Sequence, residues 1–129
     1  MSVDFRWPSI SLVTPSYNQG QYLERTIRSI LDQGYPDLEY VVMDGGSNDD
    51  SRQIIERYAG QLAHWESAED NGQADAINRG FARTQGEIMG WLNSDDVYVE
   101  GALLLVGRIF AALPEVDWIS GRALTMTPA

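Results

Sequence analysis

Short runs of apolar residues alternate along the chain with longer segments in which apolar residues recur every three or four positions. The short runs are rich in β-branched residues and stop at polar or turn-forming residues, which is typical of buried strands. They predict four strands, at residues 10–14, 40–43, 62–66 and 88–92, and the beginning of a fifth at 117–120. The first of these strands is expected to end at Pro15.

The longer segments have the period of amphipathic helices. We expect four helices, at about residues 23–33, 48–59, 73–86 and 102–113. Ser47 and Asp50 match the Ser-x-x-Asp capping pattern, so Ser47 is expected to cap the second helix. Strands that alternate with helices in this way predict an α/β fold, a three-layer sandwich with a mainly parallel sheet.

A single domain is expected to account for residues 1–129, because this length fits one core and no repeat or linker is visible. The 43% hydrophobic and 22% charged content is typical of a soluble globular chain. Apolar stretches such as 102–106 are too short to cross a bilayer, and residues 1–6 do not resemble a secretory signal. The absence of cysteine excludes a disulfide framework and is compatible with a cytoplasmic location.

The charge balance argues against a nucleic acid partner. All nine cationic residues are arginine, against nineteen acidic residues, for a net charge of −10. Such a chain repels nucleic acid phosphates and anionic lipid, and without lysine it has no P-loop. A phosphorylated ligand would therefore need a bound cation to neutralise it. The alternative is that the acidic excess only keeps the domain soluble.

Polar clusters follow three of the predicted strands, at residues 15–18, 44–47 and 93–96. In open parallel sheets, ligands bind beyond the C-terminal ends of the strands, where the strand order reverses. Three such clusters on one rim indicate a ligand site more strongly than any one of them does.

Four motifs make the chain resemble the family 2 glycosyltransferases over residues 9–99. In family order they are VTPSYN at 13–18, VMDGGS at 42–47, NGQADAIN at 71–78 and WLNSDD at 91–96. The resemblance implies a GT-A fold with a Rossmann-like nucleotide-binding half and strands in the order 3-2-1-4. It also implies that residues 1–129 form the N-terminal, nucleotide-sugar-binding part of such a domain, without the acceptor-binding part.

By this resemblance Tyr17 lies against the nucleobase, and Pro15 and Asn18 shape the same pocket. A tyrosine ring offers a flat apolar face for stacking on a base at low entropy cost. The alternative is that Tyr17 is a turn residue that packs on the first helix.

Asp44 corresponds to the family's aspartate after the second strand, which binds the base or the ribose. A carboxylate accepts hydrogen bonds from an imide N–H or from ribose hydroxyls, and Gly45 and Gly46 let a ligand approach the backbone closely. Asp-Gly-Gly is also an ordinary turn, so a structural role stays open. Together, Tyr17 and Asp44 favour a UDP-sugar.

The residues 93–96 align with the family's metal-binding Asp-x-Asp signature, with Asn93 in place of the first aspartate. Carboxylates that hold Mg²⁺ or Mn²⁺ suit the hard oxygens of a diphosphate. An amide oxygen is a poorer cation ligand, so the resemblance places the metal on Asp95, with Asp96 as a neighbour or alternative ligand and Asn93 on the sugar or ribose. The same four residues also suit a turn followed by a helix start.

The resemblance further implies that Gly72 and Asp75 flank the nucleotide and the donor sugar. Alternatively, Asp75 only complements the dipole of a capped helix, and Arg79 either reaches a phosphate or pairs with Asp75. His64 is expected to be structural. We expect Glu66, Glu69 and Glu87 to be solvated charges.

These motifs imply the metal-dependent transfer of a sugar from a nucleoside diphosphate sugar to a glycan or lipid-linked acceptor, generally with inversion. The general base is expected beyond residue 129, so the fragment itself should bind nucleotide and metal but transfer sugar poorly. The protein could also form a homodimer or associate peripherally with a membrane; the sequence leaves both open. Rival interpretations are a non-catalytic nucleotide-sugar-binding module and a self-associating α/β domain. An NAD-binding domain is the weakest, because Gly-x-Gly-x-x-Gly is missing after the first strand.

Overall fold

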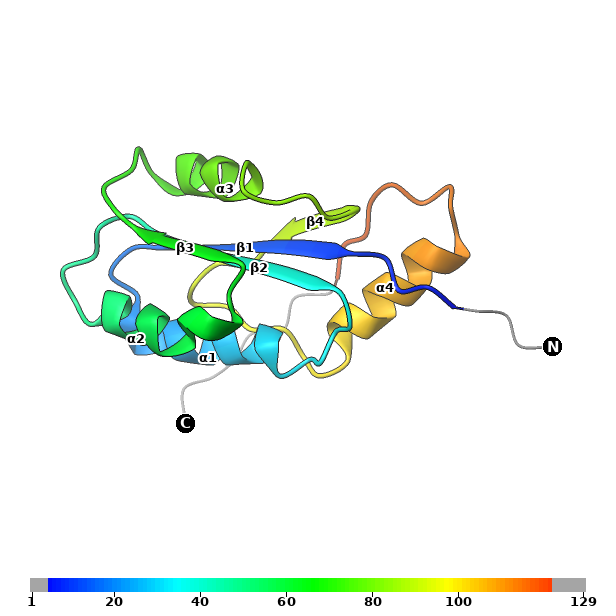
Figure 1. The fold of residues 1–129 in the computed structure, drawn as a ribbon, viewed down its shortest axis with the longest axis horizontal. Coiled ribbons are helices and arrows are strands. Elements are labelled where there is room, and N and C mark those ends of the chain that lie inside the picture. Colours follow the sequence, from blue (N-terminus) through cyan, green and yellow to red (C-terminus); the bar gives the residue numbers. More distant parts are fainter. Residues whose placement is uncertain (1–4, 122–129) are drawn as a thin grey trace.

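The computed structural model describes residues 5–121, which fold into alternating strands and helices (Figure 1). In chain order the elements are β1 (Ile10–Ser16), α1 (Gly20–Leu31), β2 (Leu38–Asp44), α2 (Ser51–Tyr58), the 3₁₀ turn η1 (Ala59–Gln61), β3 (His64–Ser67), α3 (Gln73–Phe81), β4 (Ile88–Trp91) and α4 (Ala102–Ala112). The four predicted strands and four predicted helices are all present. None of these helices is long and apolar enough to cross a membrane.

The four strands form one parallel sheet in the order β3-β2-β1-β4, which confirms the expected order. In the register of the sheet, Ser16 at the end of β1 pairs with Asp44 at the end of β2, and Asp44 pairs in turn with Ser67 at the end of β3. The carboxyl ends of these three strands therefore lie level at one edge. The predicted fifth strand is wrong, because residues 117–121 adopt no strand.

The first strand runs two residues past Thr14, its predicted last residue, and so includes Pro15, which was expected to stop it. Proline lacks a backbone N–H, so in a sheet it is tolerated only where no partner strand needs that donor. The carbonyl of Val13 accepts from the N–H of Leu92, on the β4 side of β1. Because backbone groups two residues apart in a strand face the same way, Pro15 also faces that side, where β4 has already ended at Trp91.

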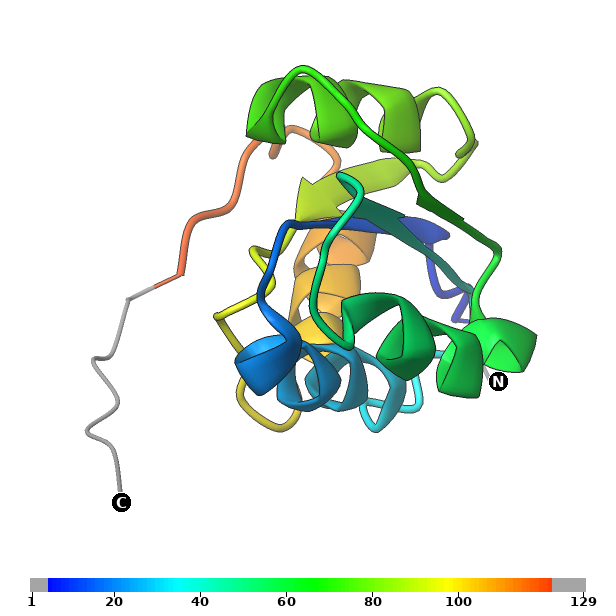
Figure 2. The same cartoon turned by 90° about the vertical axis from the view of Figure 1, so that its left-hand side faces the viewer.

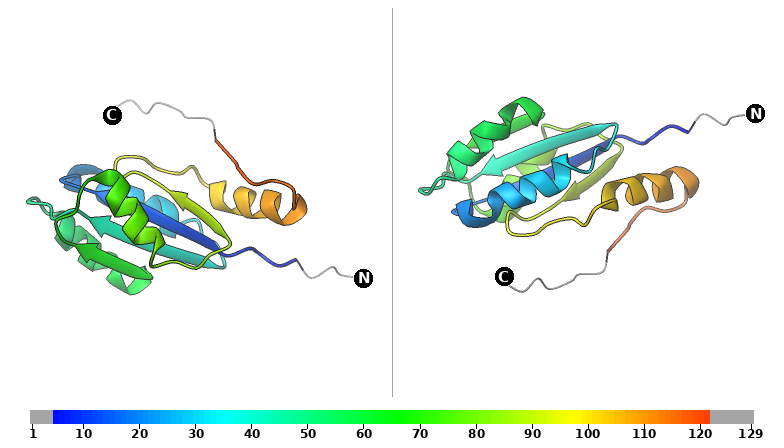
Figure 3. Two further views of the ribbon diagram at one scale, coloured as in Figure 1. Left: turned by 90° about the horizontal axis from the view of Figure 1, so that it is seen from above. Right: turned by 90° about the horizontal axis from the view of Figure 1, so that it is seen from below.

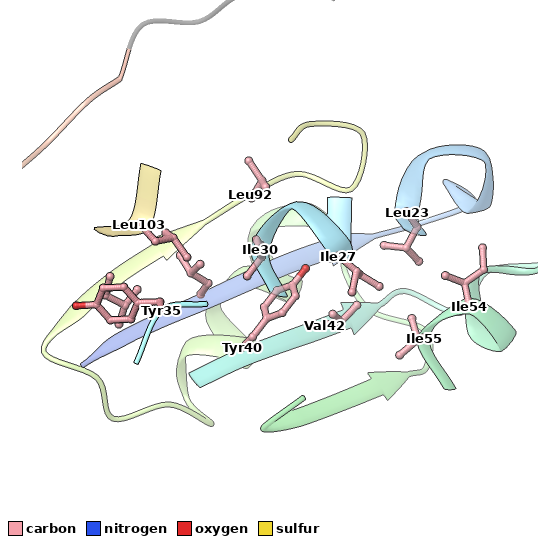
Figure 4. Close-up of a cluster of buried hydrophobic side chains, with 12 residues drawn as sticks. Leu23, Ile27, Ile30, Tyr35, Tyr40, Val42, Ile54, Ile55, Leu92 and Leu103 are labelled. Atoms are coloured by element: carbon pink, nitrogen blue, oxygen red, sulfur yellow. The ribbon is translucent and has the colours of Figure 1, made fainter. Parts of the chain in front are cut away.

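The helices cover both faces of the sheet, as the three-layer prediction required (Figures 1 and 2). Helix α3 lies alone on one face, and α1 and α2 lie on the opposite face with α4 beside them (Figure 3). On the α1 side, even-numbered residues of β1 and β2 pack with Leu23, Ile27 and Ile30 of α1 into the larger core cluster (Figure 4). Burial of this apolar stripe explains why the sequence 20–31 forms a helix here.

Helix α3 packs very close to the sheet through Gly80. A Cβ atom at Gly80 would lie 2.5 Å from a methyl carbon of Val13 and 3.2 Å from the side chain of Met43. Val13 and Met43 form the smaller core cluster with Val41 and Ala76. This contact fixes the height of α3 above the sheet, and therefore the position of its N-terminus at the carboxyl edge.

Candidate functional site

A cavity of about 690 Å³ opens at the carboxyl edge of the sheet. Its walls come from the loops after all four strands and from the first turns of α3. The lining residues are Pro15, Ser16, Tyr17, Gln19, Gly45, Gly46, Asn48, Glu69, Asp70, Gly72, Gln73, Ala76, Asn93, Ser94 and Asp95. Of the residues predicted from the sequence, Pro15, Tyr17, Gly72, Asn93 and Asp95 meet here, whereas Asn18, Asp44, Asp75 and Asp96 do not line the cavity.

The loop after β1 presents Tyr17 to the cavity and uses Asn18 to hold its shape. Tyr17 is 58% exposed, so part of its ring is available for stacking. Asn18 adopts the left-handed conformation with φ of 51°, which asparagine tolerates better than most residues. Its backbone N–H donates to Ser47 Oγ at 2.8 Å, and its Oδ1 accepts from the N–H of Asn48 at 2.8 Å. These bonds tie the loop after β1 to the loop after β2.

Asp44 is buried just beneath the cavity, with 2% of its surface exposed. Its carboxylate accepts hydrogen bonds from Ser47 N at 2.9 Å, Ser47 Oγ at 2.6 Å, Ser67 Oγ at 2.9 Å and Gly46 N at 3.2 Å. A charged acceptor with this many donors strongly fixes the surrounding backbone. Asp44 thus shapes Gly45 and Gly46, which line the cavity, and its direct contact with a ligand stays a prediction.

Ser47 does not cap the second helix, contrary to the sequence prediction. Helix α2 begins at Ser51, and its N-cap residue Asp50 makes no side-chain cap bond. Ser47 instead donates to Asp44. The neighbouring Asp49 binds the helix start, accepting from Ser51 N at 2.9 Å and from Gly20 N of α1 at 2.8 Å. Partial burial favours the neutral acid, but the hydrogen bonds from Ser51 and Gly20 outweigh it and lower the pKa of Asp49.

The loop after β4 is fixed from both sides. Thr26, buried on α1, donates from Oγ1 to the carbonyl of Asp96 at 2.6 Å, and Asp96 N donates to the carbonyl of Asn93 at 3.0 Å. On the cavity side, Gln73 Nε2 donates to Asn93 Oδ1. This arrangement directs Asn93 and Asp95 to the cavity and leaves Asp96 outside its wall.

The N-terminus of α3 faces the cavity, while Asp75 does not. Asp70 Oδ1 accepts from Gly72 N at 2.9 Å and so shapes the turn into α3. Asp75 Oδ2 accepts from Asn71 N at 3.0 Å and lies 3.9 Å from a guanidinium nitrogen of Arg79. Asp75 therefore makes the contacts of its alternative, helix-start interpretation, its contact with a ligand stays a prediction, and Arg79 pairs with Asp75.

Two acidic residues of the cavity were not predicted from the sequence. Glu69 was expected to be a solvated charge and Asp70 was given no role, yet both line the cavity with Asp95. A Cβ atom on Gly45 would lie 3.0 Å from Asp70 Oδ2, so the glycine lets the loops after β2 and β3 meet. None of the described lining residues is Arg, Lys or His. The cavity is therefore acidic.

Glu66 is also not a free solvated charge. It accepts from His64 Nε2 at 3.0 Å and lies 3.3 to 3.4 Å from guanidinium nitrogens of Arg79 and Arg83. The hydrogen bond from His64, assisted by the two arginines, holds the pKa of Glu66 below its ordinary value. This cluster joins β3 to α3 behind the cavity and commits both arginines to a structural role.

The hydroxyl of Ser16 is left without a partner at the cavity wall. Its Oγ is buried and receives or donates no hydrogen bond within residues 5–121. A buried polar group in this state costs about 1–3 kcal/mol.

Solved structures with the same fold include complexes with nucleotide sugars. Residues 1–349 of TarS from Staphylococcus aureus, crystallised with UDP-GlcNAc, match 92% of this chain and 37% of their own length with a TM-score of 0.75 at 22% identity. The mannosyltransferase PcManGT of Pyrobaculum calidifontis, in complex with GDP-Man and Mn²⁺, matches 85% of this chain and 33% of its own with a TM-score of 0.71 at 26% identity. The fold is therefore of the GT-A glycosyltransferase class.

The profile of the family described as "Glycosyl transferase family 2" matches residues 11–115, and the chain belongs to this family. A relative in Bacillus subtilis, TuaG, which is assigned provisionally as a teichuronic acid biosynthesis glycosyltransferase, is 37% identical over 99 residues, or 74% of this chain and 39% of its own. An uncharacterised glycosyltransferase of Nostoc is 33% identical over 93% of this chain and 40% of its own. The chain thus spans about two fifths of the length of these relatives.

Proposed function

We propose that this chain is the donor-binding region of an enzyme that transfers a sugar from a nucleoside diphosphate sugar, with a UDP-sugar favoured, to a glycan or lipid-linked acceptor with inversion. The observation that carries the proposal is a cavity in which residues of all four sequence motifs meet at the carboxyl edge of a parallel sheet. Ligands of such sheets bind at this edge. TarS and PcManGT, which have the same fold, were crystallised with nucleotide sugars.

The nucleobase stacks on Tyr17 in this proposal. The ring is exposed on the cavity wall, and Gly45 and Gly46 line the same cavity. The diphosphate then extends along the loop after β4 toward the N-terminus of α3, where the helix dipole favours negative charge. The nine-residue helix begins at Gln73, on the cavity wall.

A divalent cation, Mg²⁺ or Mn²⁺, fits the residues present. The acidic wall repels a bare diphosphate, and Asp95 offers an exposed carboxylate oxygen, a hard ligand for such a cation. No group of three or more His, Cys, Asp or Glu residues within 5–121 is arranged to hold a metal. Mg²⁺ is commonly held by one or two carboxylates together with substrate phosphates. The cation supplies charge neutralisation of the departing diphosphate, and Asp95 would hold it, with Asp96 as an alternative ligand.

The proton of the acceptor hydroxyl needs a separate base, because an inverting displacement requires a carboxylate on the acceptor side of the sugar. We assign this base to a segment beyond residue 129. Residues 1–129 are then expected to bind the donor and to transfer sugar poorly on their own. We place the reaction on the cytoplasmic side, without excluding peripheral association with a membrane.

A thermal-shift panel tests the proposal. The protein is melted with UDP, GDP, dTDP and CDP, each with and without Mn²⁺. A ligand whose free concentration is 100 times its Kd stabilises the folded state by about 2.7 kcal/mol. We expect the largest increase in Tm for UDP with Mn²⁺ and a small increase without the cation. No increase with any of the four nucleotides would overturn the proposed function.

A further inference from the structure

One contact crosses the cavity wall between elements far apart in the sequence. Gln73 is the first residue of α3, and Asn93 lies two residues after the end of β4, yet the Gln73 side-chain amide donates to the Asn93 side-chain amide oxygen. Both residues line the cavity. We call this contact the amide pair. It joins the α3 wall to the loop after β4, which Thr26 holds from the other side.

The amide pair decides which group Asn93 presents to a ligand. A side-chain amide has one oxygen acceptor and one NH₂ donor. With Oδ1 of Asn93 engaged by Gln73, the group that remains for the cavity is the Nδ2 donor. An aspartate at this position has no donor when ionised and would present a second acceptor oxygen.

Because the cavity is acidic, it matters for the binding of an anionic ligand whether residue 93 presents an amide donor or a carboxylate. Glu69, Asp70 and Asp95 line the wall without any Arg, Lys or His among the described lining residues. An aspartate at position 93 would add a fourth carboxylate two residues from Asp95. The amide instead adds a donor for oxygen atoms of an anionic ligand, and it leaves Asp95 as the acidic residue of this loop on the cavity wall.

We propose that Gln73 is a positioning residue that orients Asn93 so that its Nδ2 donates to a ribose or diphosphate oxygen of the bound nucleotide, and that residue 93 is not a cation ligand. This inference rests on the proposed function, because it requires a nucleotide in the cavity. It also implies that the divalent cation binds weakly until the nucleotide supplies further oxygen ligands.

Three variants test whether nucleotide affinity depends on the orientation of the Asn93 side chain and not only on its presence. In Gln73→Glu the carboxylate only accepts, so Asn93 must turn its NH₂ toward residue 73 and present its oxygen to the ligand. In Gln73→Met the partner is lost without a change in charge. Asn48→Asp is the matched control, because it adds one negative charge to the same cavity wall without touching the amide pair.

The measurement is calorimetric titration of UDP in the presence of Mn²⁺. We expect the wild-type protein to bind UDP. Gln73→Glu is expected to lose about tenfold in affinity, which corresponds to about one hydrogen bond to a charged group. Gln73→Met is expected to lose about threefold. Asn48→Asp reports the effect of charge alone and should weaken binding less than Gln73→Glu does. Equal losses in Gln73→Glu and Asn48→Asp, or an unchanged Gln73→Met, overturn this inference while the proposed function stands. Absence of wild-type binding overturns both.

A second titration tests the cation directly. With Mn²⁺ alone, Asn93→Ala is expected to bind the cation as tightly as the wild type, because residue 93 supplies no cation ligand in this proposal. A loss of Mn²⁺ affinity in Asn93→Ala would show that Asn93 is a ligand and would overturn the inference. Repeating the UDP titrations with uridine identifies the acceptor. If Gln73→Glu loses similar affinity for uridine and for UDP, the acceptor of the Asn93 hydrogen bond is the ribose. If it loses affinity for UDP but not for uridine, the acceptor is the diphosphate.

Discussion

Asp44 and Asp95 follow parallel strands of one sheet at the same edge, yet their environments differ completely. Asp44 is buried and accepts hydrogen bonds from Ser47, Ser67 and Gly46. Asp95 is exposed on the cavity wall. One carboxylate is thus used to build the loop, and the other is available for a ligand. Position at a strand end therefore selects candidate residues, and the donors around each carboxylate decide its role.

The largest expected effect on stability is at Asp44. Asp44→Ala removes the acceptor of several buried or half-buried donors, which is expected to lower the free energy of unfolding by about 3 kcal/mol. Chemical denaturation followed by circular dichroism measures this change. Ser67→Ala is the milder control, because it removes one donor and leaves the carboxylate with Ser47. A stability loss at Asp44 no larger than at Ser67 would contradict the structural role.

A smaller effect is expected at Asp49, which binds the starts of α1 and α2. Asp49→Asn is expected to cost about 1 kcal/mol above pH 5, because the amide retains only one acceptor for the Gly20 and Ser51 donors. The folded-state pKa of Asp49 is lowered, so this stabilisation is complete above the ordinary aspartate pKa and is lost as the pH falls through the folded value. The difference in unfolding free energy between the two proteins, measured from pH 7 to pH 2.5, should therefore shrink in acid. A constant difference would show that ionisation of Asp49 is not involved.

The smallest effect on stability is expected at Asp95. Asp95→Ala changes an exposed side chain, so the free energy of unfolding should stay within about 0.5 kcal/mol of the wild type. The same change is expected to abolish Mn²⁺-dependent binding of UDP, which calorimetry measures. Asp96→Ala is the neighbouring control and should weaken binding less. If Asp95→Ala leaves the UDP titration unchanged, Asp95 is not the cation ligand.

The arrangement of strands and helices was predictable because it follows from local patterns. Apolar runs such as 40–43 and the helical stripe on α1 each fix one element, and their alternation fixes the parallel sheet. The predicted strand at 117–120 shows the limit of this approach. A short apolar run with a tryptophan has the composition of a strand, but a strand also needs a partner, and residues 117–121 pair with none in the described part of the chain.

The position of the cavity was predictable from the sequence, but only some of its lining residues were. Tyr17, Asn93 and Asp95 were predicted because they belong to motifs of the resembled family that lie in the loops after the strands, and all three line the cavity. Glu69 and Asp70 were missed, since the sequence does not show how far a loop folds back over the sheet. Their signal was the position of the loop 68–72, between the end of β3 and the N-terminus of α3. Ser47 was misassigned because its hydroxyl donates to Asp44 and accepts from the N–H of Asn18, two contacts that the local sequence pattern does not show.

The bonds of Asn18 to Ser47 and Asn48 have a consequence for how the cavity responds when it is filled. They join the loops after β1 and β2 into one mechanical unit, so a ligand that shifts the loop of Tyr17 would also shift the backbone at Ser47 and Asn48. Resonances of both loops should therefore change together along a titration with such a ligand.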